Sequence, residues 1–406
     1  MRLPCVLAYL SAFGTLESQW FLLGNLGDAD AWQYSVPTSG GDSTVMAKAG
    51  LVFPDIDPIL RDRVRTRGWA LCVGAGTSVP TFPSWNTLVE RLVARDVGDA
   101  HAHDLTKRLL ERFNADALIQ SASDRLRYSG NKFAEILTDE LYRDIRSKLT
   151  DQEWKLVSNA LSAPNPGDMT RRARREFVGI IRSHYDGLSS TTLAEIVSEI
   201  ADTKVSPAAI ISFNAEPLLF TLISLKISHR VADGSSKATI KGEQQPHLDM
   251  VTHGTSNRRQ DRIPYFFCHG LLPVPDVHRR RALGAVDKLV FSEGNYLQLA
   301  NSSFSWQSSV FIDVCAFHSV VFVGVSLSDP NMRRWLSWVH ANRVQELQGR
   351  FGYDGPSTDH YWISRLPESH DEREWIEASV AHLGVRLVWI PGWSKLEQAL
   401  RSMLGI

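Results

Sequence analysis

Short apolar runs recur along this chain, and several of them stop abruptly at glycine, asparagine or histidine. Residues 69–73 read Trp-Ala-Leu-Cys-Val and are followed at 74–78 by Gly-Ala-Gly-Thr-Ser. An amphipathic stretch then begins at Ser84. A continuous apolar run with such boundaries is typical of a buried parallel strand, and the amphipathic stretch is typical of a helix. The pattern therefore predicts a strand, a glycine-rich turn and a helix in that order.

The same alternation of strands and helices returns after Pro207. The stretches 216–227 and 294–316 have helical character, whereas residues 231–262 are polar and rich in turn residues. Short strands that alternate with helices imply right-handed crossovers, so we expect an α/β fold with a Rossmann-like, doubly wound parallel sheet. The further predicted strands are 208–212, 264–269, 288–292, 319–324, 359–364 and 384–390.

Between about 96 and 204, apolar residues such as Leu105 and Leu109 fall at helical spacing. We predict that this segment is a helical insertion in the α/β frame. Residues 1–55 mix apolar and turn residues and are expected to form an N-terminal extension. This extension packs either on the main domain or on a neighbouring subunit, and in the second case it would be an assembly segment. Residues 56–406 would then form the main domain.

Composition adds limits on location and partners. The 406 residues are 43% hydrophobic, which fits a packed core, and the net charge of −1 gives no overall attraction to nucleic acid or anionic lipid. No run reaches the ~18 apolar residues of a membrane span. The first residues resemble a short signal peptide, but Pro4 and Ser11 interrupt the apolar run and no cleavage site follows. We therefore expect a cytoplasmic protein.

The four cysteines are widely scattered, and none forms a Cys-x-x-Cys pair. This spacing excludes a zinc ribbon and gives no basis for a disulfide framework. Three basic clusters also stand out, at 61–67, 171–175 and 278–281. Each is either a solvated face or a surface for phosphate or polynucleotide, and the sequence leaves direct nucleic-acid binding open.

Residues that can carry chemistry follow four of the predicted strands. In a doubly wound sheet the carboxyl ends of the strands form the ligand-binding edge, so these residues are expected to meet around one cleft. A glycine turn followed by a helix lets backbone N–H groups meet a pyrophosphate, which makes a dinucleotide the first ligand to consider. The residues are Gly74, Ala75, Gly76, Thr77 and Ser78, then Asn214 and Glu216, then His269, and finally Gly324, Ser326 and Asp329.

Each of these residues also has a structural explanation. Asparagine is favoured at helix N-caps, so Asn214 could cap the helix that follows it. His269 could be a strand-end histidine with its hydrogen bonds satisfied, and Ser326 and Asp329 could cap the next helix. The paired glycines could serve a tight turn alone. Convergence on one sheet edge is what favours the functional interpretation.

The chain carries four motifs in a fixed order: Gly-Ala-Gly-x-Ser at 74–78, the turn at Asn214, His-Gly at 269–270 and Gly-x-Ser-Leu at 324–327. Together they resemble the sirtuin-like (silent information regulator type) NAD-binding domain. The closer similarity is to its bacterial branch in anti-phage defence systems. That branch carries Pro-x-Trp-x-x-Leu, here 83–88, and Gly-x-Ser-x-x-Asp-Pro-x, here 324–331. The resemblance covers roughly 69–390.

The resemblance implies NAD as the substrate. Asn214 would hold the nicotinamide ribose and position the attacking water, and His269 would accept a proton from a ribose hydroxyl or from that water. Cleavage of the N-glycosidic bond needs a fixed ribose, a placed nucleophile and a base that works near neutrality, but no metal. The residues implied to bind the dinucleotide are Gly74, Ala75, Gly76, Thr77 and Ser78 around the pyrophosphate, Glu216 near the ribose, and Gly324, Ser326 and Asp329 toward the adenosine.

Two features of sirtuin deacylases are absent from the sequence, the four-cysteine zinc module and a Pro-Asp-Phe-Arg segment after the glycine turn. Their absence favours water as the acceptor, so the resemblance implies an NAD glycohydrolase that depletes cellular NAD in anti-phage defence, as in abortive infection. Glu216 stands where aspartate is usual, and bulky Phe213 precedes Asn214. These departures keep open a non-catalytic subunit that binds NAD or ADP-ribose in a defence complex. A protein deacylase ranks below both.

The resemblance further implies regulation by assembly. We expect a homo-oligomer, with residues 1–55 and the helical insertion as candidate contact surfaces. A separate ATPase of the DNA-translocase type, or another defence protein, is the expected partner, because the chain has no P-loop of its own. No membrane association is expected.

Overall fold

The structure is a computed structural model, and its described residues belong to a unit that runs from Ala47 to Ile406. Three predicted features lie wholly or largely outside the described residues: the extension at 1–55 except for 50–54, the cluster at 278–281, and most of the excursion at 231–262. The described ranges are 50–54, 58–126, 131–232, 248–256, 259, 261–277, 289–301, 305–352 and 357–406.

Within these ranges, eight strands form one sheet in which every neighbouring pair is parallel. The predicted doubly wound parallel sheet is confirmed. The strands are β1 (Leu51–Val52), β2 (Trp69–Val73), β3 (Ile210–Ser212), β4 (Leu248–Val251), β5 (Ile263–Phe267), β6 (Ser319–Val323), β7 (His360–Arg365) and β8 (Val385–Ile390).

The spatial order of the strands is β1-β8-β7-β6-β2-β3-β5-β4, and the direction of winding reverses beside β2. After β2 the chain builds the side that contains β3, β4 and β5, and it then crosses to the other side of β2 to build β6, β7 and β8. Loops that leave the strands at such a reversal diverge and open a crevice at the carboxyl ends. The cleft at this edge is lined by both turns, those that follow β2 and β6.

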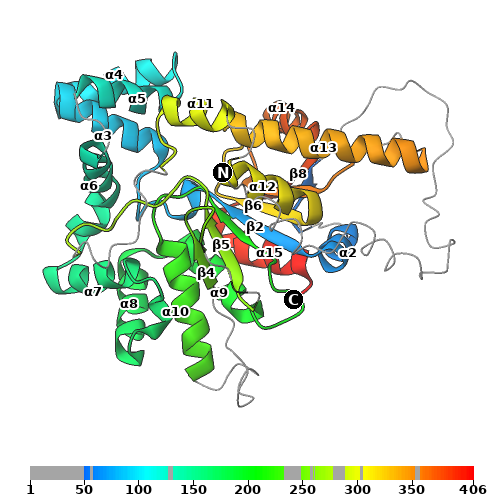
Figure 1. Cartoon of the computed structure of the whole chain (residues 1–406), viewed down its shortest axis with the longest axis horizontal. Coiled ribbons are helices and arrows are strands. Elements are labelled where there is room, and N and C mark those ends of the chain that lie inside the picture. Colours follow the sequence, from blue (N-terminus) through cyan, green and yellow to red (C-terminus); the bar gives the residue numbers. More distant parts are fainter. Residues whose placement is uncertain are drawn as a thin grey trace, which may run out of the picture. The chain divides into compact units, whose positions relative to one another are not determined.

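Helices connect the strands and cover the sheet (Figure 1). Short 3-10 helices at Ala75–Thr77 (η2), Pro166–Asp168 (η3) and Trp393–Lys395 (η5) join some of them. The α-helices are α2 (Pro58–Arg67), α3 (Trp85–Val97), α4 (Asp99–Leu110), α5 (Ala115–Arg125), α6 (Asn131–Lys148), α7 (Asp151–Leu161), α8 (Arg171–His184), α9 (Ser189–Ile200), α10 (Leu218–Ala232), α11 (Glu293–Asn301), α12 (Trp306–Phe317), α13 (Pro330–Phe351), α14 (His370–Ala381) and α15 (Leu396–Leu404).

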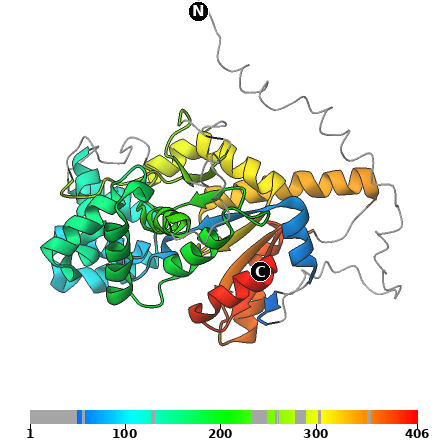
Figure 2. The same cartoon turned by 90° about the horizontal axis from the view of Figure 1, so that it is seen from below.

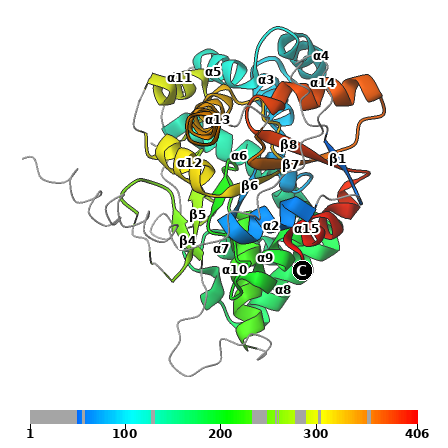
Figure 3. The same ribbon diagram turned by 90° about the vertical axis from the view of Figure 1, so that its right-hand side faces the viewer.

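The two faces of the sheet have separate hydrophobic cores. On β2 the side chains alternate, since Leu71 and Val73 belong to one core and Ala70 and Cys72 to the other. Buried residues of α9, α10 and α15 join the first core, whereas those of α12, α13 and α14 join the second. Figure 3 shows α12 and α13 on one side of the strands and α9 and α15 on the other. Burial on both faces explains why the strands are almost continuously apolar.

Helices α4 to α9 occupy the segment for which helical spacing predicts an insertion. Local capping explains where some of them begin. Thr150 starts α7 with a capping box, because its hydroxyl accepts the N–H of Glu153 (3.3 Å) and the Glu153 carboxylate accepts the N–H of Thr150 (2.9 Å). Figures 1 and 2 show most of these helices, α4 to α8, gathered beside the sheet, whereas α9 lies against it.

Some predictions about single elements are wrong. Residues 289–292 form no strand, because the segment meets the end of β5 through one hydrogen bond, from Val290 N–H to the His269 carbonyl (3.0 Å). The stretch 294–316 is two helices rather than one, since Ser305 caps the second by accepting the N–H of Ser308 (3.1 Å). Strand β4 lies inside the polar excursion, and β1 lies inside the predicted extension, where it pairs with β8.

Three cysteines, Cys72, Cys268 and Cys315, are buried and free. Burial raises the pKa of the Cys72 and Cys315 thiols well above the ordinary value. None of the described helices has both the length and the apolar character that crossing a membrane requires.

Candidate functional site

The turn after β2 packs directly against the turn after β6. Gly76 N–H donates to the carbonyl of Gly324 (3.0 Å), and Gly74 N–H donates to that of Val323 (3.2 Å). A Cβ on Gly74 would lie 2.7 Å from the Gly324 oxygen, and a Cβ on Gly324 would lie 2.5 Å from the Thr77 nitrogen. Gly324 also has a φ of +66°, a conformation that side chains disfavour. Glycine is therefore required for the close approach of these two strand ends.

The glycine turn itself offers few unbonded N–H groups. It forms η2, in which Thr77 N–H donates to the carbonyl of Gly74 (3.0 Å) and Ser78 N–H donates to that of Ala75 (3.0 Å). The Thr77 hydroxyl also donates to the Gly74 carbonyl (2.9 Å). The sequence predicts that the backbone of this turn binds a pyrophosphate. Few of its N–H groups are free to do so, because most of them already donate to backbone carbonyls. Other donors have to contribute.

A cavity of about 570 Å³, here called the main cleft, opens at the carboxyl ends of the strands. Its volume lies within the range of about 300–1,000 Å³ that is usual for small-molecule sites. None of its lining residues is lysine or arginine. They are Gly74, Ala75, Gly76, Ser84, Trp85, Asn86, Leu110, Phe113, Asn114, Ala115, Asp116, Phe213, His269, Tyr296, Gly324, Val325, Ser326, Ser328, Asp329, Pro330 and Met332.

Three helices begin at the main cleft. The first turns of α3 and α5 present backbone N–H groups without intrahelical partners, together with the positive end of the helix dipole, whereas Asp329 already accepts the N–H groups at the start of α13. The two open helix ends favour an anion, and the charged side chains of the lining are two carboxylates, Asp116 and Asp329, with no lysine or arginine. The N-cap residues are Ser84 for α3, Asn114 for α5 and Asp329 for α13, and all three line the cleft.

His269 lines the main cleft with one ring nitrogen partnered and the other without a partner. Its Nε2 lies 3.3 Å from the Tyr296 hydroxyl and 3.4 Å from Oδ2 of Asp329. Its Nδ1 is buried and has no hydrogen-bond partner among the described residues. The ring packs edge-on against Phe213, with centroids 4.8 Å apart. A proton on Nε2 that faces the Asp329 carboxylate would leave Nδ1 as an acceptor, which is the state of a general base.

Asp329 does two things at once. Its Oδ1 caps α13 by accepting the N–H groups of Asn331 (2.8 Å) and Met332 (3.2 Å), while its Oδ2 faces His269. The capping explanation therefore holds for Asp329. It does not hold for Ser326, whose hydroxyl lies 2.6 Å from that of Ser328 at the exposed rim.

A second cavity, here called the inner cavity, adjoins the main cleft and contains Asn214. Its volume is about 30 Å³, which is room for a single water molecule. It shares Ala75, Ser84, Trp85 and Phe213 with the main cleft. The aromatic side chains of Trp85 and Phe213, which border both spaces, are here called the aromatic wall. The inner cavity is lined by Ala75, Ser78, Phe82, Pro83, Ser84, Trp85, Leu88, Leu141, Phe213, Asn214, Ala215, Glu216 and Phe291.

Asn214 is fixed through its amide nitrogen. This nitrogen donates to Oε1 of Glu216 (3.1 Å) and lies 3.4 Å from the hydroxyls of Thr77 and Ser78. Its Oδ1 is buried and has no partner among the described residues. Asn214 does not cap α10, because the Glu216 carboxylate accepts the N–H of Leu218 (2.5 Å) at the start of that helix. Its buried carbonyl oxygen is therefore available to a ligand.

Glu216 lies behind Asn214 and lines only the inner cavity. The Ser78 hydroxyl donates to its Oε1 (2.6 Å). Burial raises the pKa of this carboxyl from 4.5 to about 7, although the hydrogen bonds from Ser78, Leu218 and Asn214 act in the opposite direction. Glu216 therefore orients Asn214 and Ser78.

The predicted residues meet at one sheet edge but divide between two adjoining spaces. Thr77 is buried and lines neither. Sequence reasoning missed Tyr296 and the first turn of α5; only Asn114, a residue type favoured at N-caps, gave a signal for the latter. The main cleft contains Gly74, Ala75, Gly76, His269, Gly324, Ser326 and Asp329, and the inner cavity contains Ala75, Ser78, Asn214 and Glu216.

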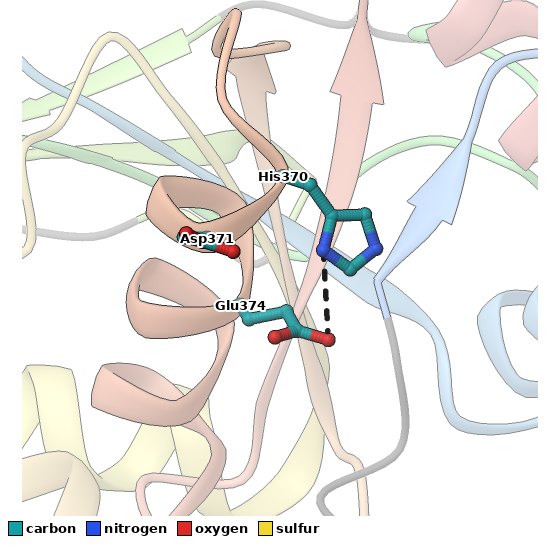
Figure 4. A group of neighbouring side chains, drawn as sticks. All are labelled: His370, Asp371 and Glu374. Carbon is teal, nitrogen blue, oxygen red and sulfur yellow. Dashed lines mark ion pairs between the residues drawn. The ribbon is translucent and has the colours of Figure 1, made fainter.

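One group of metal-ligating side chains lies apart from both spaces. His370, Asp371 and Glu374 stand on the first turns of α14, and His370 Nδ1 lies 3.7 Å from the Glu374 carboxylate (Figure 4). All three side chains are exposed. Such solvated groups are common on helix surfaces, so this cluster says nothing about a metal.

Comparison with known proteins agrees with this geometry. Residues 230–383 match a family model described as SIR2-like domain. The matched segment contains His269 and the turn at 324–329, whereas the glycine turn and Asn214 join the site through the contacts described above. No curated protein matches the chain. SIR2-like domains bind NAD and are in general NAD-dependent enzymes. Residues 230–383 therefore belong to a sirtuin-like, or SIR2-like, domain.

Proposed function

We propose that this protein is an NAD glycohydrolase, which cleaves NAD to nicotinamide and ADP-ribose with water as the acceptor. The observation that carries the proposal is the meeting of two open helix N-termini, those of α3 and α5, with two buried, unpartnered polar atoms, Oδ1 of Asn214 and Nδ1 of His269. The helix ends suit a pyrophosphate, and the two atoms suit ribose hydroxyls and water. A dinucleotide offers both kinds of group.

The bonding of His269 suits a base. In the reaction the ribose–nicotinamide C–N bond breaks with its electron pair on the leaving nicotinamide, a water oxygen bonds to the ribose carbon, and one proton is lost. His269 would take that proton on Nδ1, while the Asp329 carboxylate accepts from Nε2–H and stabilises the imidazolium. The Tyr296 hydroxyl holds the same nitrogen from the other side.

Asn214 would position the ribose and the water. Its amide nitrogen is fixed by Glu216, so its carbonyl oxygen has a defined direction before any ligand arrives. Glu216 would act through Asn214 rather than on the ribose. This assignment replaces the expectation that a carboxylate at this position contacts the ribose.

The aromatic wall of Trp85 and Phe213 favours a second candidate, a non-catalytic subunit that binds NAD or ADP-ribose. The inner cavity, at about 30 Å³, has no room for a nicotinamide ring. The wall must therefore move before the nicotinamide ribose can reach Asn214. An enzyme that stays inactive until it assembles would have such a requirement. We therefore also propose that the protein assembles into a homo-oligomer or with a defence partner.

The test follows nicotinamide and ADP-ribose released by the purified chain across a size-exclusion profile, alone and with candidate partner proteins. We expect equimolar products in at least one assembly state, and a fall of on the order of 10²–10⁴ in His269→Ala and Asn214→Ala. Asn342→Ala, a change at an exposed asparagine of α13 outside the cleft lining, is the matched control. NAD binding without turnover in every state would favour the binding subunit. Release that needs an acylated peptide would favour a deacylase.

A further inference from the structure

The helices of the insertion hold another cavity, of about 470 Å³, between α8, α9 and α10. It shares no lining residue with the main cleft or the inner cavity. The basic cluster at 171–175 contributes two of its side chains. We call it the basic cavity, and it is lined by Arg174, Arg175, Val178, Gly179, Arg182, Glu195, Ser198, Leu225, Lys226, His229 and Arg230.

The lining of the basic cavity has a large excess of positive charge. Five of its side chains are lysine or arginine, and Glu195 is the single carboxylate. Glu195 is already engaged, because it accepts from Arg182 (2.7 Å) and from Lys226. Neither Arg175 nor Arg230 forms a salt bridge with a described residue. Glu199, which does not line the cavity, interacts electrostatically with Arg230. Cations still outnumber carboxylates in the lining.

Two of these cations have limited contact with water. Lys226 is 9% exposed, and burial lowers the pKa of its ammonium. Arg174 donates to the carbonyl of Gly167 (3.0 Å), but its Nε is buried without a partner in the described part of the chain. Cations that are both poorly solvated and crowded are costly unless an anion joins them. These side chains therefore point to an anionic ligand.

Two helices connect the basic cavity to the candidate catalytic residues. At the start of α9, Ser190 donates to the carbonyl of Thr77 (2.8 Å) and lies 3.3 Å from the Ser78 hydroxyl. Glu195 of the same helix lines the basic cavity about 8 Å further along the axis. The first N–H of α10 bonds to Glu216, and Lys226 lies about 12 Å further along that helix.

We propose that the basic cavity is an effector site for a small ligand that bears a pyrophosphate group, and that α9 and α10 couple it to the main cleft. Guanidinium and ammonium groups from different helices can hold adjacent phosphates at once. A cavity of this size between three helices fits a small molecule, whereas a polynucleotide would need a basic stripe along an extended surface. The effect on turnover rests on the proposed function, but binding to the cavity does not.

The binding test is a calorimetric titration of the full chain with inorganic pyrophosphate at physiological salt, since this probe is the shared group of all such ligands. We expect one ligand per chain. Arg175→Ala and Arg230→Ala should each weaken binding by about tenfold, the equivalent of one lost charge-assisted contact. The matched control is Arg172→Ala, an exposed arginine on the same helix that does not line the cavity. Equal weakening in all three variants, or no binding, would overturn the site.

The coupling test measures the Kd of NAD for the His269→Ala chain with and without saturating pyrophosphate. Linkage requires that an effector which changes NAD affinity has its own affinity changed by the same factor, and we expect at least about fivefold. Pyrophosphate binding that leaves the Kd of NAD unchanged would overturn the effector role. A third outcome is that pyrophosphate does not bind, whereas a duplex oligonucleotide binds in a way that requires Arg175 and Arg230. That outcome would overturn the assignment of the basic cavity to a small molecule. Because the first titration uses no NAD, its failure is distinguishable from failure of the proposed hydrolase activity.

Discussion

The main cleft and the basic cavity are two anion-favouring spaces built on opposite principles. The main cleft has no lysine or arginine in its lining and relies on the helix N-termini of α3 and α5, each with a fixed direction. The basic cavity relies on five long, flexible cations. Preorganised dipoles suit a site where a bond must break in one geometry, because they need no rearrangement. Flexible cations suit a site that only has to sense charge.

The largest expected effect that would sharpen this contrast concerns Asp329. Asp329→Asn keeps the cap of α13 and the shape of the side chain, but it turns an amide N–H toward Nε2 of His269. That favours the tautomer with the proton on Nδ1, so kcat for NAD should fall by on the order of 10²–10⁴ with little change in KM. Steady-state kinetics of nicotinamide release measure both.

Asp329→Ser is the matched control for the cap, since serine also caps helices. It removes the carboxylate without imposing the wrong tautomer, so its kcat should fall less than that of Asp329→Asn. A role in capping alone predicts normal kcat for both variants, with thermal unfolding unchanged. Neither change should alter pyrophosphate binding in the basic cavity.

A second prediction concerns the buried carboxyl at the start of α10. The folded-state pKa of Glu216 is raised to about 7 from 4.5, so the folded chain binds this proton more tightly than the unfolded chain. The resulting stabilisation is complete below about pH 4.5 and is lost as the pH rises through about 7, a change of roughly 3 kcal/mol. Glu216→Gln removes it. Urea unfolding at several pH values should therefore give a flatter profile for the variant.

Glu111→Gln, on an exposed carboxyl, controls for the loss of a charge. If Glu216→Gln and Glu111→Gln change the pH profile of unfolding equally, Glu216 does not hold its proton as described. Lost NAD turnover with an unchanged profile would instead indicate a role in catalysis alone.

The smallest expected effect is on salt dependence. Exposed and half-buried cations are screened by salt, whereas helix ends inside a cleft are screened less. Between about 50 and about 300 mM NaCl, we expect pyrophosphate binding to weaken by about tenfold and NAD binding to the His269→Ala chain by no more than about threefold. Titration calorimetry of both ligands tests this. Equal salt dependence for the two ligands would contradict the assignment of helix ends to the main cleft and of side-chain cations to the basic cavity as the anion-binding groups.

The parallel sheet could be predicted because burial on both faces leaves a plain apolar signal in β2 and β6. The predicted site residues also follow from a simple rule, that carboxyl ends of strands share one edge. The segment at 289–292 could not be told from a strand, because its burial comes from tertiary packing rather than from pairing. The apolar character of a segment indicates that it is buried, but it does not indicate which hydrogen bonds its backbone forms.

Other features depend on contacts that the sequence does not encode locally. The start of α5 reaches the main cleft only because the insertion folds back on the sheet edge, and Tyr296 reaches His269 from a helix that carries no motif. The glycine turn was expected to bind phosphate, yet the close approach of Gly74 to Gly324 already requires glycine. A glycine that close packing requires and a glycine that ligand binding requires look the same in the sequence.

In the proposed complex, NAD occupies the main cleft with its nicotinamide ribose toward Asn214. Crystals of the His269→Ala chain grown with NAD would show this arrangement, because the variant retains the cleft but not the base. We expect density for the pyrophosphate at the first turns of α3 and α5, with Phe213 displaced. Pyrophosphate density in the basic cavity alone, with the main cleft empty, would show that the proposed complex is wrong.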